Sequence, residues 1–203
     1  MKAKYKIILV TSLSLLFSIN VNKIYAASNN QNYQKNFINK LKNDVISVSN
    51  KYKLYGSIMM SQAALESSWG QSQLAIKGNN YFGVKGSYKG QSVSVSTTEY
   101  NAKGQLYKTK ANFKKYPDVY SSLNDNGNLL RNGSSWNPSF YSATWKENAK
   151  DYTEAAQGLV GKYATDPNYA NKLIKIIDTY KLDELLDNKT SKKKYILKQI
   201  LHQ

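Results

Sequence analysis

The chain of 203 residues contains no cysteine, a single histidine and only 13 acidic residues. Without cysteine there is no disulfide framework, no thiol nucleophile and no thiolate metal site. The one histidine, His202, lies next to the C-terminal end, where a Ser-His-Asp triad or a multi-histidine zinc site is hard to build. Hydrolytic chemistry in this chain therefore depends on carboxylates, and we expect neither a metal nor a cofactor.

Long apolar runs are also scarce. Three lysines within residues 1–6 precede an apolar stretch over residues 7–21, and small residues follow at 26 and 27. This order is typical of a secretory signal, and the run is shorter than the ~20 residues of a membrane span. We therefore predict that residues 1–27 are removed and that the protein is secreted and associated with the cell wall, without stable membrane insertion.

Acidic residues are too few to balance the 29 lysines and arginines, so the formal net charge is +16. Removal of residues 1–27 takes away four lysines and leaves +12. An exported basic protein suits an anionic extracellular polymer such as a bacterial cell wall. Nucleic acid is the competing partner, but the lysines are scattered and Arg131 is the only arginine, so we do not expect it. An alternative interpretation is that the positive charge only keeps the protein soluble.

The first half of the chain shows helical and then strand periodicity. Apolar residues at three- and four-residue spacing predict an amphipathic helix from Tyr33 to about Val48. Ser57 is the expected N-cap of a short apolar helix that contains Glu66 and ends at Gly70. After a glycine-rich loop over residues 78–90, alternation in 91–100 and a return in 105–113 predict a β-hairpin.

The second half is predicted to be helical, with a loop over residues 126–139. Apolar spacing from Tyr152 to Tyr163 predicts one helix, and Asp166 followed by a proline opens another. Because no βαβ alternation occurs, we predict a mainly helical α+β domain with a small β lobe. It spans residues 28–187, and residues 188–203 form a basic tail that we interpret as a surface helix rather than a membrane or wall contact.

Two carboxylates stand out as catalytic candidates. Glu66 is flanked by apolar residues and Trp69, with no lysine within ten residues, so its pKa is expected to rise toward that of a general acid. Glu99 ends the predicted strand, from which it can project toward the helices; the alternative is a surface ion pair of little energetic value. Nearby aromatic rings offer platforms for sugar faces: Trp69, Tyr81, Phe82 and Tyr100.

Four ordered motifs carry a family resemblance. QAALESSWG at 62–70, NNYFGVKG at 79–86, TTEY at 97–100 and YATDPNY at 163–169 resemble the glucosaminidase domain of glycoside hydrolase family 73, over about residues 33–186. The resemblance implies a lysozyme-like fold of two lobes with a substrate groove between them. It also implies an endo-β-N-acetylglucosaminidase that cleaves the β-1,4 bond after N-acetylglucosamine in peptidoglycan glycan strands.

The resemblance also implies site roles. Glu66 is similar to the family's general acid, Glu99 to the second carboxylate, and Tyr163 to the tyrosine that borders the catalytic centre, although Tyr163 also fits the spacing of a core helix. We add Asn80 to the predicted substrate-binding residues. Ser68 stands where the family commonly has glycine, and an insertion around residues 132–141 has no counterpart that we can place.

Several alternatives stay open at this point. A lytic transglycosylase or muramidase has a related fold and one dominant glutamate, a cell-wall-binding module keeps the groove without the reaction, and a basic exported protein can act on membranes. Glu99 is a nucleophile if the two carboxyl groups lie ~5–5.5 Å apart, and the base of an inverting reaction at ~6.5–9.5 Å. A third route uses the substrate's own N-acetyl group. We expect a monomer whose partners are glycan strands and anionic wall polymers.

Overall fold

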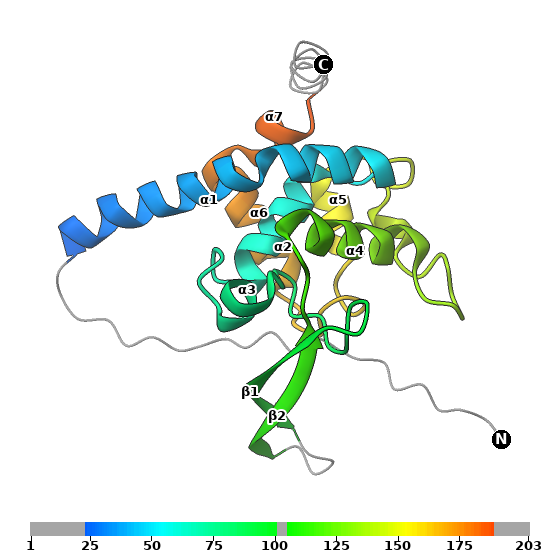
Figure 1. Ribbon diagram of the computed structural model, residues 1–203. Coiled ribbons are helices and arrows are strands. Elements are labelled where there is room, and N and C mark those ends of the chain that lie inside the picture. Colours follow the sequence, from blue (N-terminus) through cyan, green and yellow to red (C-terminus); the bar gives the residue numbers. More distant parts are fainter. Residues whose placement is uncertain (1–22, 101–104, 189–203) are drawn as a thin grey trace, which may run out of the picture.

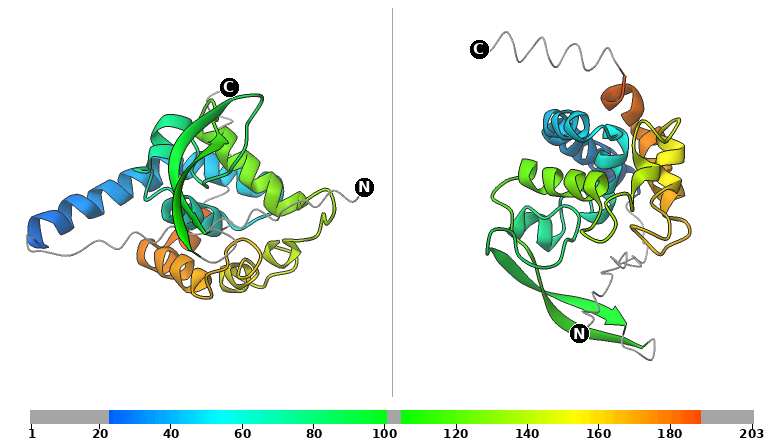
Figure 2. Two further views of the ribbon diagram at one scale, coloured as in Figure 1. Left: turned by 90° about the horizontal axis from the view of Figure 1, so that it is seen from below. Right: turned by 90° about the vertical axis from the view of Figure 1, so that its right-hand side faces the viewer.

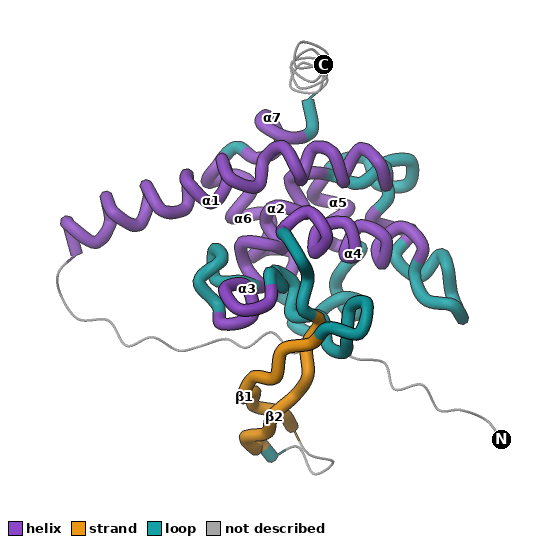
Figure 3. Tube along the Cα trace, viewed as in Figure 1, coloured by secondary structure: helices purple, strands orange, loops and turns teal. Residues whose placement is uncertain are grey.

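The computed structural model describes the backbone of residues 23–100 and 105–188, and the side chains of 32–96 and 105–188. In this part of the chain, helices form the body and two strands form a projecting hairpin (Figures 1 and 3). In chain order the elements are α1 (Lys23–Tyr52), α2 (Gly56–Glu66), α3 (Gln73–Gly78), β1 (Ser92–Tyr100), β2 (Leu106–Lys114), α4 (Val119–Asn132), the 3-10 helix η1 (Ser142–Thr144), α5 (Tyr152–Gln157), α6 (Tyr169–Tyr180) and α7 (Leu182–Leu186). The predicted mainly helical α+β class is confirmed.

Helix α2 is the centre of the domain, and its residues from 56 to 64 are all buried. Helices α1, α4, α5, α6 and α7 all contact it. The apolar residues that predicted α1 face this core: Phe37, Ile38, Leu41, Val45, Ile46 and Val48 are buried. Because α2 is enclosed on most sides, the position of its last residue, Glu66, is fixed by the packing of the whole bundle.

The start of α2 corrects one sequence expectation. The helix begins at Gly56, preceded by Tyr55, and no side chain of the N-cap residue bonds to its first turn. Instead, the backbone N–H of Gly56 donates to Asp187 Oδ1 at 2.7 Å. Ser57 is therefore inside the helix. Asp187, which is distant in the sequence, accepts the hydrogen bond from an N–H group that an N-cap side chain would normally accept.

The hairpin matches its prediction and stands away from the helices (Figure 2, right). Strands β1 and β2 are antiparallel, with Ser92 opposite Lys114 and Tyr100 opposite Leu106. At the base of the hairpin, Lys114 Nζ and Tyr116 Oη both contact Asp125 Oδ2 of α4 at 2.7 Å. These contacts fasten one end of the hairpin to the helical body.

Three helix boundaries in the second half differ from the predictions. The predicted loop over 126–139 is helical up to Asn132, because Gly127 lets α4 lie against α1: a Cβ there would be 2.6 Å from the Tyr52 ring. Helix α5 ends at Gln157, so Tyr163 lies in turns and not in a helix. Helix α6 begins two residues later than the Asp-Pro pair suggested.

Most of the predicted signal segment and of the basic tail lies outside the described residues, and residues 23–27 belong to α1. No helix of the described chain is both long enough and apolar enough to cross a membrane.

Candidate active site

Glu66 is the last residue of α2, and the chain reverses directly after it. Ser68, Trp69 and Gly70 all have positive φ, at 50°, 58° and 81°. The Trp69 N–H donates to the Ala64 carbonyl at 2.7 Å. A glycine suits such a conformation better than serine, so the glycine that the family commonly has in place of Ser68 fits this geometry. Strained backbone beside a functional group is characteristic of active sites.

The Glu66 carboxyl accepts a hydrogen bond from a side chain of α6. The hydroxyl of Tyr169, the first residue of α6, donates to Glu66 Oε1 at 2.8 Å. The same hydroxyl accepts a bond from Gln62 Nε2 at 3.4 Å. Both Gln62 and Tyr169 are fully buried, with 0% exposure. A buried amide and a buried phenol therefore hold the carboxyl in one orientation.

Burial raises the pKa of Glu66, because the ionised form loses hydration. The hydrogen bond from Tyr169 and the charge of Lys172 act in the opposite direction, and burial is the largest of the three causes. Lys172 is itself paired with Asp166 Oδ2 at 2.6 Å. A carboxylic acid with a raised pKa can keep its proton near neutral pH and donate it to a leaving oxygen.

Tyr163 lies beside this pair. Its ring stacks on that of Tyr169, with centroids 5.8 Å apart and planes at 27°. Burial raises the pKa of Tyr163, and the negative charge of Glu66 raises it further. The structure thus brings Glu66, Tyr163 and Tyr169 together, even though Tyr163 is not on the predicted helix.

Glu99 and Tyr100 occupy the last two positions of β1, opposite Tyr107 and Leu106. This confirms the strand but says nothing of their side chains, which lie outside the described residues. The catalytic role of Glu99 and the substrate contact of Tyr100 therefore remain predictions.

The other predicted sugar contacts have structural roles here. Trp69 packs between Phe37 and Tyr180, with centroids 5.7 Å and 5.0 Å away, and so fixes the turn after Glu66. Tyr81 is 4% exposed and lies against Phe37. Trp69 is only partly buried, and its contact with a substrate remains a prediction.

Asn80 and Phe82 differ from the prediction. Phe82 has no exposed surface and Asn80 has 1%. The Asn80 amide donates to the carbonyls of Val84 and Lys114 at 3.0 and 2.9 Å and accepts from the Val84 N–H at 3.0 Å. Neither side chain is available to a substrate in this structure, so we leave both out of the proposed site.

Sequence reasoning did not assign roles to Gln62 and Tyr169. Both fall inside the quoted motifs, at the start of QAALESSWG and at the end of YATDPNY. Gln62 precedes Glu66 by four residues, so both project from the same face of α2; this spacing was the available signal. Among the described residues, no three His, Asp or Glu side chains gather closely enough to hold a metal ion.

Comparisons with known proteins agree with this geometry. The sequence model of the glucosaminidase family, described as mannosyl-glycoprotein endo-β-N-acetylglucosaminidase, matches residues 42–182. The catalytic domain of the autolysin Auto from Listeria monocytogenes is 42% identical, with a TM-score of 0.73 over 82% of this chain and 99% of that one. The fold and the site together define a lysozyme-like glycoside hydrolase domain.

Two relatives of this chain have names that specify a kind of glycoside hydrolase. The exo-glucosaminidase LytG of Bacillus subtilis is 43% identical over 74% of this chain and 53% of its own length. A probable N-acetylmuramidase of Lactococcus lactis is 37% identical over 86% of this chain and 39% of its own length. The chain therefore belongs to the glucosaminidase family, and it spans about half or less of the length of these relatives.

Proposed function

We propose that the protein is a secreted peptidoglycan hydrolase, an endo-β-N-acetylglucosaminidase that cleaves the β-1,4 bond between N-acetylglucosamine and N-acetylmuramic acid. The observation that carries the proposal is the partly buried Glu66 carboxyl, held by Tyr169 at 2.8 Å and with a raised pKa. The name of the Lactococcus lactis relative, a probable N-acetylmuramidase, supports peptidoglycan as the polymer, because N-acetylmuramic acid is a sugar of peptidoglycan.

In the proposed reaction, protonated Glu66 donates its proton to the glycosidic oxygen as the C–O bond breaks. Glu99 activates water or stabilises the oxocarbenium-like charge, and water supplies the new hydroxyl group at the sugar's anomeric carbon. Tyr163 borders the centre and orients the substrate's acetamido group. Gln62 and Tyr169 act as positioning residues, because they reach the substrate only through Glu66.

The second candidate is a muramidase, which the name of the Lactococcus lactis relative favours. The two activities leave different reducing ends. Purified peptidoglycan is digested with residues 28–203, reduced with borohydride and analysed by mass spectrometry, beside a Glu66→Gln control. Reduced glucosamine ends that vanish in the control support the proposal. Muramic acid ends favour the muramidase, anhydromuramic ends a transglycosylase, and no product at all contradicts a hydrolytic function.

We further propose that the protein acts as a monomer in the cell wall, where the net charge of +12 left by signal removal holds it to anionic polymers. Activity on intact walls should then fall as ionic strength rises, because screening weakens exposed charge interactions. Activity that does not change with salt would contradict this part of the proposal.

A further inference from the structure

A row of aromatic rings leads from the candidate acid to the protein surface. From Tyr169, which bonds Glu66, the row continues through Tyr163, Tyr141 and Phe140 to Trp136. The successive centroid distances are 5.8, 6.4, 4.9 and 5.4 Å. The inner rings of the row are buried, and Trp136 at its outer end is 59% exposed. The row therefore connects the candidate active site with an exposed indole.

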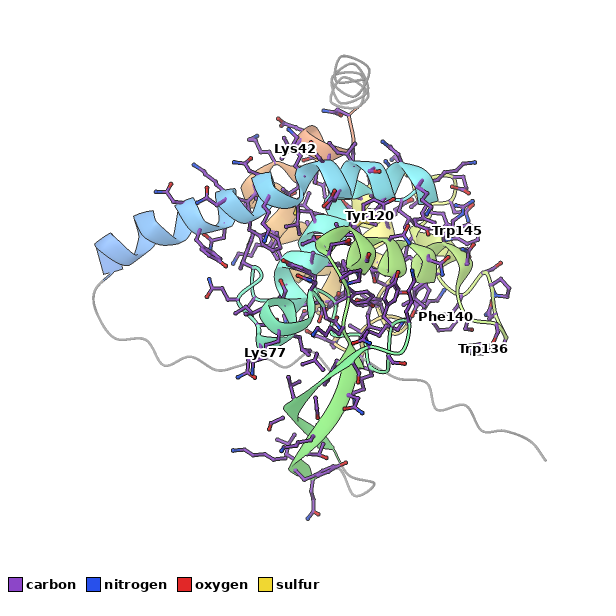
Figure 4. The ribbon with its side chains drawn as sticks, in the orientation of Figure 1. Lys42, Lys77, Tyr120, Trp136, Phe140 and Trp145 are labelled. Carbon is purple, nitrogen blue, oxygen red and sulfur yellow. The ribbon has the colours of Figure 1, made fainter. Side chains whose placement is uncertain are left out.

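The loop that presents Trp136 is well defined by its hydrogen bonds. Ser134 and Asn137 exchange two backbone bonds at 3.2 and 3.0 Å, so Trp136 lies at the tip of a tight turn. Gly133 has φ +59°, and a Cβ there would be 2.2 Å from the Asn137 carbonyl oxygen, so only glycine fits. Figure 4 shows Trp136 and Phe140 together at the edge of the molecule. The turn therefore keeps the Trp136 indole in contact with water, beside the half-buried Phe140 ring.

The chain around the indole is polar. Residues 132–141 contain amide and hydroxyl side chains and no acidic residue. Lys162 Nζ lies over the Phe140 ring, 5.6 Å from its centroid, and supplies a positive charge. An aromatic face covers the apolar C–H face of a pyranose ring, while amides, hydroxyls and an ammonium group reach its hydroxyl and carboxylate substituents.

We propose that Trp136 and Phe140 form a distal sugar-binding subsite that holds the same glycan strand whose bond is cleaved at Glu66, with Lys162 facing the strand's carboxylates. This inference rests on the proposed function. A protein partner needs about 800 Å² of surface on each side, far more than one indole and a half-buried phenyl ring provide. One or two sugar rings match the patch, and the packed rings of the aromatic row fix its position relative to the candidate acid.

The test compares long glycan strands with short peptidoglycan fragments that contain the bond to be cleaved but have too few sugars to reach Trp136 as well. For each variant the ratio of kcat/KM on long strands to kcat/KM on short fragments is measured. Trp136→Ala should lower this ratio roughly three- to tenfold, since a lost aromatic contact contributes about that factor. Trp136→Tyr should restore most of the ratio, because it keeps a flat ring. Tyr120→Ala is the matched control: Tyr120 is 39% exposed on α4 and is not part of the row.

Binding is measured separately in a Glu66→Gln background by titrating long strands. If the apparent Kd rises for Trp136→Ala and not for Tyr120→Ala, the subsite is supported. An unchanged ratio together with an unchanged Kd overturns the subsite, even when the parent enzyme is fully active. If the parent enzyme cleaves neither substrate, the proposed function fails instead, and the Kd comparison still tests whether Trp136 binds glycan. Melting temperatures of all variants exclude unfolding as the cause.

Discussion

The hydroxyl of Tyr169 offers the sharpest test of how the candidate acid is held. Tyr169→Phe keeps the buried ring and its stacking on Tyr163, and it removes the one oxygen that joins Gln62 to Glu66. Because this hydrogen bond lowers the pKa of Glu66, its loss should raise that pKa further.

The size of this pKa change follows from the hydrogen bond that Glu66 loses. A hydrogen bond to a charged group contributes about 1.5–3 kcal/mol, which is roughly a ten- to hundredfold change in the equilibrium between ionised and neutral Glu66. A general acid is active only while protonated, so the alkaline limb of the pH profile of kcat/KM should move to higher pH. At low pH, where Glu66 is protonated in both proteins, kcat should still be reduced, because the acid has lost its orientation.

The assay is peptidoglycan hydrolysis followed over a range of pH, with the pKa of Glu66 measured independently by NMR. Tyr152→Phe is the matched control, because the Tyr152 hydroxyl donates to Asp178 Oδ1 at the same 2.8 Å on an exposed surface. The control should leave the alkaline limb in place. If Tyr169→Phe also leaves both the limb and the NMR titration in place, Tyr169 does not control the protonation of Glu66 and our reasoning is refuted.

Two further predictions concern stability. The folded-state pKa of Glu66 is raised above its unfolded value of 4.5, so the wild type loses stability as pH rises from 4.5 through the folded pKa. The melting temperature of Glu66→Gln relative to wild type should therefore be higher at pH 7 than at pH 4, and equal differences at both pH values would contradict the burial of the charge. Asn80→Ala should lower the melting temperature by roughly 5–12 °C, because it removes three hydrogen bonds to the backbone of Val84 and Lys114, including the acceptor of the Val84 N–H. A raised KM with an unchanged melting temperature would instead restore Asn80 to the substrate site.

Sequence patterns predicted the elements that are held by contacts between neighbours in the sequence or that have one buried and one exposed face. Alternation identified the two strands of the hairpin to within one residue. The three- and four-residue spacing identified α1, and the apolar segment that ends at Gly70 identified α2, with Glu66 near its end. The short helices α3 and α7 were missed, since six and five residues carry too little periodicity to detect.

The errors arise where a distant contact overrides local preference. Asn126 and Gly127 read as loop residues, yet α4 continues through them because Gly127 permits the close contact with Tyr52. Tyr163 fits a helical spacing, but Gly161, with φ +73°, lies in the turns that follow α5. The bond between Tyr169 and Glu66 joins residues 103 positions apart, and no periodicity reveals such a pair.

The hydrogen bond between Gly56 and Asp187 determines when the first turn of α2 can be completed during synthesis. The two residues are 131 positions apart, so a ribosome that has completed α2 still has most of the domain to synthesise. The first turn of the helix that carries Glu66 stays incomplete until Asp187 has emerged and folded back. Nascent chains, and fragments that end before residue 187, therefore lack this contact at the first turn of α2.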